Sequence, residues 1–247
     1  MVENSPFETP KDWNEELPPE LFYAEPKIEV LYRDEHFIAV NKPAGILVHP
    51  MKEKDPEKKN LLKLVKWQQR AYLYPIHRLD RPVSGIVIFA LSSKSASLLK
   101  EIWHDDQFVK EYLLLCKGIT PDKGEFNKAL TDEKGIKREA LTSFERIEAF
   151  PPRFSFCKAQ IQTGRNHQIR RHFAHFCFSL VGDTQHGKGR INQEFRDRFN
   201  LHRIFLHAHY LAFKHPVTNV YTEIRSPLPE LLNQCLVGLR EKIFPDS

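Results

Sequence analysis

The most informative part of the 247-residue chain is the segment His77-Arg78-Leu79-Asp80-Arg81-Pro82-Val83-Ser84-Gly85. It lies between two strand-like apolar runs. Pro82 disfavours helical backbone at the residue before it, and Ser84-Gly85 can form a turn. We therefore predict that Asp80 lies on a loop at a strand end, flanked by two arginines. Such a carboxylate can be a nucleophile, a general base or a metal ligand, or only a turn residue paired with arginine.

The apolar pattern on either side of this segment predicts a mixture of strands and helices. Alternating or β-branched runs predict strands at 28–32, 37–40, 86–91, 109–116, 138–147, 154–161, 204–213 and 221–225. Apolar stripes and capping residues predict helices at 61–70, at 93–104 after a Ser92 or Ser93 cap, at 166–176, and from Pro229 onward. This mixture favours an α+β fold.

Residues 1–26 differ in composition from the rest of the chain. They hold seven acidic residues against Lys11 alone, and five prolines. We predict an acidic, proline-containing N-terminal extension that is draped on the body or disordered, followed by one domain over residues 27–247. No separate folded domain is expected ahead of that domain.

The compartment and class of the protein follow from what the composition excludes. No window approaches the roughly 18 unbroken apolar residues of a membrane helix, and the N-terminus lacks the pattern of a signal peptide. The four cysteines are widely separated without a Cys-x-x-Cys pair, which argues against a zinc ribbon or a thioredoxin-like redox site. We expect a cytoplasmic monomer with reduced thiols and no membrane contact.

Positive charge is concentrated in the segment from Lys158 to His215. This segment has ten lysines and arginines against three acids, and eight of the twelve histidines. A local excess of this kind is typical of a phosphate-binding surface, although a solvated basic face would have the same composition.

Two further segments carry candidate chemistry. Thr163-Gly164-Arg165-Asn166-His167-Gln168-Ile169-Arg170-Arg171-His172 predicts a turn that runs into a helix, with a buried stripe of Ile169, Phe173 and Phe176. Arg170 borders this stripe, where an arginine usually pairs with a carboxylate, and Asp80 is a suitable partner.

The other segment is Lys110-Glu111-Tyr112, within a predicted strand. Tyr112 can be a packing residue. It can also stack on an extruded base or use its phenol in proton transfer.

Taken together, these segments resemble the motifs of the RluA family of pseudouridine synthases, in the family's order. The opening motif is Asn41-Lys42-Pro43-Ala44-Gly45-Ile46-Leu47-Val48-His49-Pro50, and His77 to Gly85 matches the catalytic motif. Lys110 to Tyr112 and Thr163 to His172 match the other two. The similarity continues in Leu180-Val181-Gly182-Asp183, Leu206-His207-Ala208 and His215-Pro216.

The resemblance implies a pseudouridine synthase fold, with a largely antiparallel mixed sheet, flanking helices and a catalytic cleft across the sheet. It also implies that Asp80 is the catalytic aspartate, Arg170 its ion-pair partner and Tyr112 the active-site tyrosine. One departure is Val83, where the family usually has threonine; the similar shape predicts little loss of fold and one missing hydrogen bond. With the basic segment, the resemblance indicates these RNA-binding residues: Arg78, Arg81, Arg165, His167, Arg171, Lys188 and Arg190.

The implied reaction needs no cofactor and no metal. The bond from ribose C1′ to uracil N1 breaks, the base rotates, and C1′ joins C5, without net redox change or a group donor. We expect Asp80 to start the reaction by attacking the sugar or adding to the base, while Arg170 holds the carboxylate charged and oriented. Tyr112 would stack on the base and assist removal of the C5 proton. The uridine must be flipped out of the folded RNA, and phosphate contacts can offset that cost.

The RNA partner is expected to be tRNA. The segment from Gln185 through Arg198, with His202-Arg203 and Arg81-Pro82, is similar to the C-type tRNA synthase subgroup, which implies uridine 65 in the acceptor and T-arm region as the target. A synthase acting on ribosomal RNA is the alternative.

Two other classes of protein remain open at this stage. The histidines His167, His172, His175, His207 and His209 suggest a zinc hydrolase, but no His-Glu-x-x-His helix is present. A non-catalytic RNA-binding protein would also have a basic segment. RNA binding alone does not explain the presence of Asp80, Tyr112 and Arg170 together.

Overall fold

The computed structural model describes residues 27–49 and 59–241. The predicted extension at 1–26 lies outside the described residues. The strands are β1 Val30–Arg33, β2 Phe37–Lys42, β3 Tyr74–Pro75, β4 Ser84–Ala90, β5 Val109–Lys117, β6 Lys123–Phe126, β7 Leu130–Thr131, β8 Lys137–Arg138, β9 Thr142–Phe150, β10 Phe154–Ile161, β11 Leu206–Lys214 and β12 Tyr221–Arg225. The helices are α2 Leu61–Gln69, α3 Ser93–Ile102, α4 Gln168–His175, α5 Gly189–Phe199 and α6 Glu230–Arg240.

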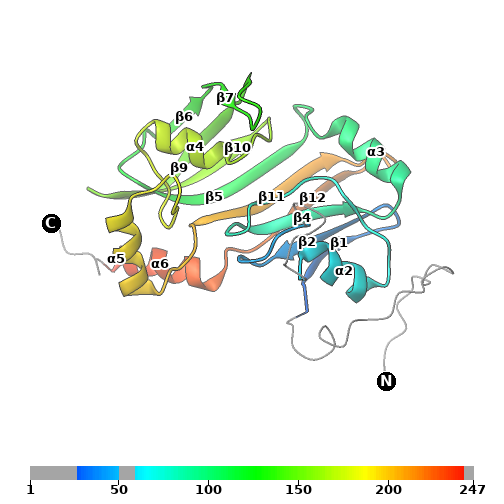
Figure 1. Ribbon diagram of the computed structural model, residues 1–247, viewed down its shortest axis with the longest axis horizontal. Helices are drawn as coiled ribbons and strands as arrows, with labels where there is room; N and C mark the ends of the chain where they lie inside the picture. Colours follow the sequence, from blue (N-terminus) through cyan, green and yellow to red (C-terminus); the bar gives the residue numbers. More distant parts are fainter. Residues whose placement is uncertain (1–26, 50–58, 242–247) are drawn as a thin grey trace.

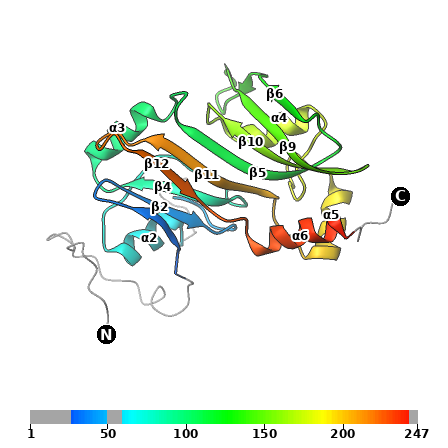
Figure 2. The ribbon, with the colours of Figure 1, turned by 180° about the vertical axis from the view of Figure 1, so that it is seen from behind.

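One large mixed sheet crosses the whole molecule (Figure 1). Its strand order is β1-β2-β4-β11-β5-β10-β9-β6, and β12 and β3 pair with β11 and β4. Figure 1 shows α3 at one end of the long central strands and α5 with α6 at the other, and Figure 2 shows β12 beside β11 from behind. Strands and helices in this arrangement confirm the predicted α+β fold with a largely antiparallel mixed sheet.

The sheet buries apolar side chains on both faces, as the alternation along its strands requires. Leu114 belongs to the core that α2 and α4 cover, whereas its neighbour Leu115 belongs to the core that α5 and α6 cover. A third core lies between α3 and the first strands. Among the described residues, no helix is long and apolar enough to cross a membrane.

The two halves of the sheet meet where β4 runs parallel to β11, the one parallel pair among those described. Ser84 and Gly85 lie opposite His207 and Ala208. The prediction of a turn at Ser84-Gly85 is wrong, because both residues are in β4. Gly85 has a φ of +115°, and a Cβ there would lie 2.1 Å from the Ala208 carbonyl oxygen, so glycine permits this close approach.

Other differences from the predicted elements have local causes. Helix α5 was not predicted; its basic, polar sequence hides the few apolar residues that it buries, such as Phe195. The strand predicted at 138–147 begins instead at Thr142, since Lys137–Arg138 forms the separate short strand β8. Phe176 is 41% exposed and stacks on Phe126, so it is not part of the buried stripe that Ile169 and Phe173 form.

A buried polar network reinforces the parallel junction. His207 is fully buried, and its Nδ1 lies 2.8 Å from Ser84 Oγ, which also accepts a hydrogen bond from Arg203 Nη2. His207 Nε2 lies 3.3 Å from the Ser226 carbonyl oxygen, which can only accept, so Nε2 carries the proton. Burial, with a smaller contribution from Arg203, lowers the pKa of His207 to about 4.

This shift predicts an acid-labile fold. Because the pKa of an unfolded histidine is about 6.5, the unfolded chain binds more protons than the folded protein below that pH, and the contribution of His207 is lost as pH falls from about 6.5 towards 4. The full loss is on the order of 3 kcal/mol. Replacing His207 with Asn should flatten the pH dependence of the free energy of urea unfolding over this range. The same replacement at exposed His202 should leave it unchanged.

Candidate active site

A cavity of about 310 Å³ opens in the sheet beside the loop that precedes β4. Asp80 lines it from that loop, Tyr112 from β5 and Arg170 from α4. Three segments that are far apart in the chain therefore meet at one cavity. Its wall also contains apolar groups such as Val83, Ile169 and Leu206, which leave room for a planar ring.

Arg170 is the centre of the polar contacts at this cavity. Its side chain is 5% exposed, and its Nη1 donates to Asp80 Oδ2 over 2.8 Å. On the other side, Nε and Nη2 donate to the two carboxylate oxygens of Asp183 over 2.8 and 2.9 Å. Nη2 also donates to Gln185 Oε1. One guanidinium thus links two carboxylates, with the planar fork held by Asp183 and the remaining nitrogen directed at Asp80.

Asp183 fixes this guanidinium from inside the protein. Its side chain has no exposed surface, and its Oδ1 accepts hydrogen bonds from the backbone N–H groups of Gln185 and His186. Burial would raise the pKa of Asp183, but the hydrogen bonds from Arg170 and these N–H groups outweigh burial and lower it. Asp183 and Asp80 in turn raise the pKa of Arg170 against the opposite effect of its burial.

A buried lysine holds the Asp80 loop. Lys42 is fully buried, and its Nζ donates to the carbonyl oxygens of Pro43, Arg81 and Val83. The Val83 N–H donates to the Asp80 carbonyl, which closes a turn around the carboxylate. Burial, and secondarily the charge of Arg203, lowers the pKa of Lys42 to about 7. The loop is therefore fixed through its backbone, and the Asp80 side chain, 19% exposed, is free to face the cavity.

Gln168 fixes the loop on the opposite side of the cavity. Its Oε1 accepts from the Thr163 hydroxyl and from the Arg165 N–H, while its Nε2 donates to the Leu141 carbonyl and to Thr142 Oγ1. These bonds tie the turn before α4 to the start of β9.

Tyr112 is half-buried on the cavity wall. Burial, together with the nearby charge of Asp80, raises the pKa of its phenol well above the usual value. The side chain is therefore a neutral phenol that borders the cavity.

Comparison with known proteins identifies the family. A family model described as RNA pseudouridylate synthase matches residues 36–175, more than half of the chain. The chain belongs to this family. The matched region contains Asp80, Tyr112 and Arg170, and the enzyme class is that of an isomerase that converts uridine in RNA to pseudouridine.

Individual relatives and solved structures agree with this assignment. The synthase is similar to tRNA pseudouridine synthase C of Vibrio parahaemolyticus, with 34% identity over 229 residues that cover 84% of this chain and 93% of the relative. The protein of the same description from Vibrio vulnificus is 35% identical over 228 residues, with the same coverage. Human RNA pseudouridylate synthase domain containing 4 has the same fold, with a TM-score of 0.70 and 19% identity, covering 86% of this chain and 93% of that one.

The residues predicted to bind RNA divide into two groups in the synthase. Arg78, Arg165 and His167 line the cavity. The others are outside it: Arg81, Arg171, Lys188 and Arg190.

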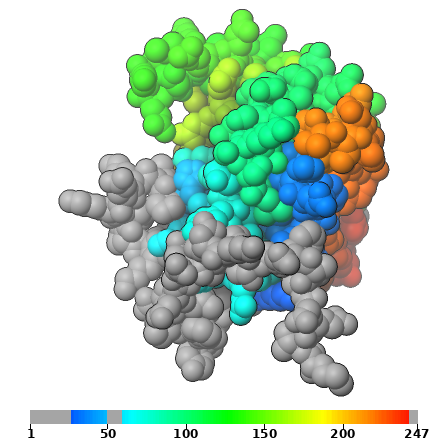
Figure 3. Space-filling model, turned by 90° about the vertical axis from the view of Figure 1, so that its right-hand side faces the viewer, coloured from blue at the N-terminus to red at the C-terminus, as the bar shows by residue number. Residues whose placement is uncertain are grey.

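Several of these arginines also make structural bonds. Arg81 Nε donates to the Gly45 carbonyl, Arg165 Nε to the Glu139 carbonyl and Arg171 Nη1 to the Thr131 carbonyl. The last two bonds brace the segment with β7 and β8, which projects from the body as the bright green part of Figure 3. Lys188 and Arg190 lie exposed at the start of α5.

The histidines considered as zinc ligands have other partners. His172 bonds to Thr142 and to the Lys128 carbonyl, and His207 to Ser84. His175 contacts Lys128, and no three metal-ligating side chains converge anywhere in residues 27–49 or 59–241.

The sequence interpretation quoted four residues that shape the site only as members of motifs and assigned none of them a role: Lys42, Gln168, Asp183 and His186. Asp183 was visible as an acid directly after an apolar run, and Lys42 as a lysine at the end of a buried strand. A charged residue in such a position signals an internal partner, although the sequence does not say which one.

The Arg170–Asp183 pair predicts a large loss of stability when it is broken. Asp183→Asn keeps the size of the side chain but removes the charge that holds the buried guanidinium, and we expect a cost of about 3–5 kcal/mol in urea unfolding. The control is Glu148→Gln, which breaks the exposed pair with Arg240 and should cost less than about 1 kcal/mol. An equal loss in the free energy of unfolding for the two substitutions would show that the buried pair stabilises the protein no more than the exposed pair.

Proposed function

We propose that the protein isomerises a uridine of tRNA to pseudouridine, with Asp80 as the nucleophile. The observation that carries this proposal is the placement of Asp80 between the Arg170 guanidinium and an open cavity bordered by Tyr112. A carboxylate held at one oxygen can present the other to a substrate. The contact over 2.8 Å also orients it before the substrate arrives.

The residues of the cavity account for the bonds that must change. Asp80 attacks the ribose or the base as the bond from C1′ to N1 breaks, and C1′ then joins C5. Arg170, fixed by Asp183, keeps the carboxylate in one orientation throughout. Val83, which is 2% exposed, packs in the core beside this loop without the hydroxyl that threonine would provide.

Tyr112 stacks on the flipped uracil in this proposal. Its raised pKa means that the resting phenol carries its proton and cannot by itself accept another from C5. The acceptor of the C5 proton is then the Asp80 carboxylate, once it has separated from the substrate. Tyr112 assists by holding the base and by hydrogen bonding as a donor.

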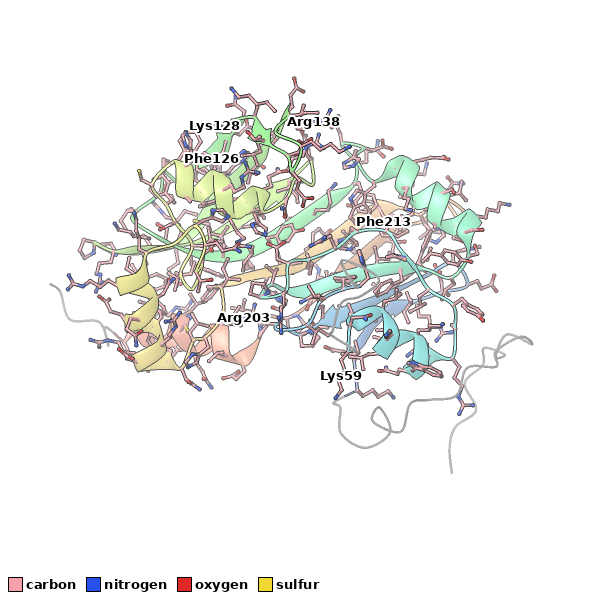
Figure 4. All side chains as sticks on the ribbon, viewed as in Figure 1. Lys59, Phe126, Lys128, Arg138, Arg203 and Phe213 are labelled. Atoms are coloured by element: carbon pink, nitrogen blue, oxygen red, sulfur yellow. The ribbon has the colours of Figure 1, made fainter. Side chains whose placement is uncertain are left out.

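Basic side chains next to the cavity are placed to contact the phosphates that flank a flipped nucleotide. Arg78 and Arg165 are exposed and line the cavity. In Figure 4, Lys128 and Arg138 lie at the upper edge of the molecule, in the half where Figure 1 shows α4. Phosphate contacts from this side would offset the few kcal/mol that base flipping costs.

Similarity to relatives supports tRNA as the substrate, and uridine 65 is the target that the resemblance to the C-type subgroup implies. The two Vibrio relatives described above are both named tRNA pseudouridine synthase C, and each is aligned over most of both chains. A tRNA substrate also favours action in the cytoplasm.

Asp80→Asn should abolish turnover. Asparagine keeps the shape of the side chain but is neither a nucleophile nor a base, so pseudouridine formation should stop while the Kd for RNA changes little. Tritium release from RNA labelled at C5 of uridine measures turnover, and filter binding measures Kd. Asp122→Asn, which removes an 85% exposed carboxylate paired with Arg146 outside the cavity, should retain wild-type activity. Substantial product from Asp80→Asn would contradict the role of nucleophile.

The substrate is tested with transcripts. A C5-tritiated tRNA transcript with uridine at position 65 should release tritium, and the same transcript with cytidine at that position should not. Ribosomal RNA transcripts should release none. Tritium release from ribosomal RNA transcripts, with none from the tRNA transcript, would show that the substrate is ribosomal RNA. Tight binding without release from any transcript would indicate a non-catalytic RNA-binding protein.

A further inference from the structure

Two histidines form a chain that leads away from Asp80. His167 Nε2 lies 3.6 Å from Asp80 Oδ2, and its other ring nitrogen, Nδ1, lies 3.3 Å from His186 Nε2. The rings come from different segments, the turn before α4 and the loop before α5. His167 lines the cavity, whereas His186 does not, and both side chains are partly exposed.

The two segments hold the imidazoles in this order. His167 precedes α4 with a φ of +52°, a backbone conformation that few residues other than glycine adopt. The His186 N–H donates to Asp183, which also binds Arg170. The ion pair that orients Asp80 therefore also fixes the backbone of the second histidine.

We infer that His167 and His186 form a proton relay that carries the C5 proton of the substrate from Asp80 to solvent. The inference rests on the proposed function. Asp80 accepts the C5 proton and must lose it again before the next turnover. Tyr112 cannot take this proton, and the relay supplies the missing acceptor.

The transfer can be written with each proton accounted for. When C1′ is bonded to C5, the C5–H bond breaks, its electrons return to the uracil ring, and Asp80 takes the proton. N1, which lost its bond to C1′, takes up a proton from water, so the isomerisation releases no net proton. The proton arrives on Oδ1, the oxygen that Arg170 leaves free, and rotation of the carboxyl group brings it to the side of His167. Asp80 then passes the proton to Nε2 of His167 as Nδ1–H of His167 passes its own to Nε2 of His186. His186 then releases the proton on its Nδ1 to water. The carboxylate is restored, and each imidazole has exchanged one tautomer for the other.

The distances agree with the resting state that this sequence requires. A gap of 3.6 Å between Nε2 and the carboxylate oxygen is longer than a hydrogen bond, as expected where neither atom carries a proton. The gap of 3.3 Å between the rings is within hydrogen-bonding range, with Nδ1–H of His167 as donor. Protonation of Asp80 would supply the missing hydrogen and draw the first pair together.

Burial keeps both rings neutral, as a relay needs. Asp80, Arg170 and Asp183 act on both imidazoles, and Arg171 acts on His186. Burial is the largest cause, and it lowers the pKa of each ring; the two arginines add to burial, and the two aspartates oppose it. A neutral imidazole has one free nitrogen and one N–H, so it can accept and donate in the same step.

The test compares multiple-turnover with single-turnover kinetics on the C5-tritiated tRNA transcript. His167→Asn and His186→Asn keep polar side chains without a transferable ring proton, and each should slow multiple-turnover tritium release and pseudouridine formation by about tenfold or more. Pseudouridine formation in a single turnover precedes the relay and should keep the wild-type rate. The double variant should be no slower than the slower single variant, because both residues serve one path. The Kd for the transcript should stay at the wild-type value.

Chemical rescue separates proton transfer from a structural role. His167→Gly suits the positive φ and opens the space of one ring, so added imidazole should restore much of its rate, more at pH values where imidazole is neutral. Imidazole should not restore Asp80→Asn. His36→Asn, which alters a histidine outside the cavity beside Ser95, should keep the wild-type rate.

The outcomes distinguish failure of the relay from failure of the proposed function. A wild-type protein that forms no pseudouridine from any transcript overturns the proposed function itself. With an active wild-type protein, the relay is overturned by wild-type multiple-turnover rates in both histidine variants, or by losses that multiply in the double variant. It is also overturned if imidazole does not restore His167→Gly, or if the variants fail through a raised Kd, which would make His167 an RNA contact.

Discussion

The Arg170 guanidinium, held between Asp183 and Asp80, is the interaction on which the rest of the site depends. A buried positive charge is costly unless it is paired and fully hydrogen-bonded, and here each of its three nitrogens has an acceptor. The fixed pair with Asp183 leaves Asp80 as the partially exposed member. The interior of the protein thus determines the orientation of the one carboxylate that faces the cavity.

The sheet must bring distant strands together for this pairing to exist. Asp80 precedes β4 and Tyr112 lies on β5, with β11 between these two strands. The parallel junction of β4 with β11 permits no side chain at Gly85 and is bonded through Ser84 and His207. Lys42 then holds the Asp80 loop through three carbonyl oxygens. Close backbone packing below the loop therefore limits where the carboxylate can be.

Most of the strands and helices could be predicted from the sequence because apolar periodicity reports burial directly. Tertiary contacts were harder to foresee. A helix as polar as α5 gives little periodic signal, and the turn chemistry of Ser84-Gly85 suggested the wrong local structure because the requirement for glycine comes from Ala208 on another strand. Asp80, Tyr112 and Arg170 could be named through their motifs. The partner that fixes Arg170 could not, since any of several acids satisfies the same pattern.

The composition of the segment from Lys158 to His215 does not show which of its basic residues have structural partners. Its composition indicates a surface for phosphates, yet Arg170 is buried in an ion pair, Arg203 bonds to Ser84, and Arg171 bonds to the carbonyl of Thr131. Some of these basic residues hold the site together, and others lie around the cavity. Because Arg165 lines the cavity while it also braces the Glu139 carbonyl, a contact between this arginine and RNA would act on the loop that carries His167. Such a contact would therefore couple binding of the RNA backbone to the arrangement of the groups beside Asp80.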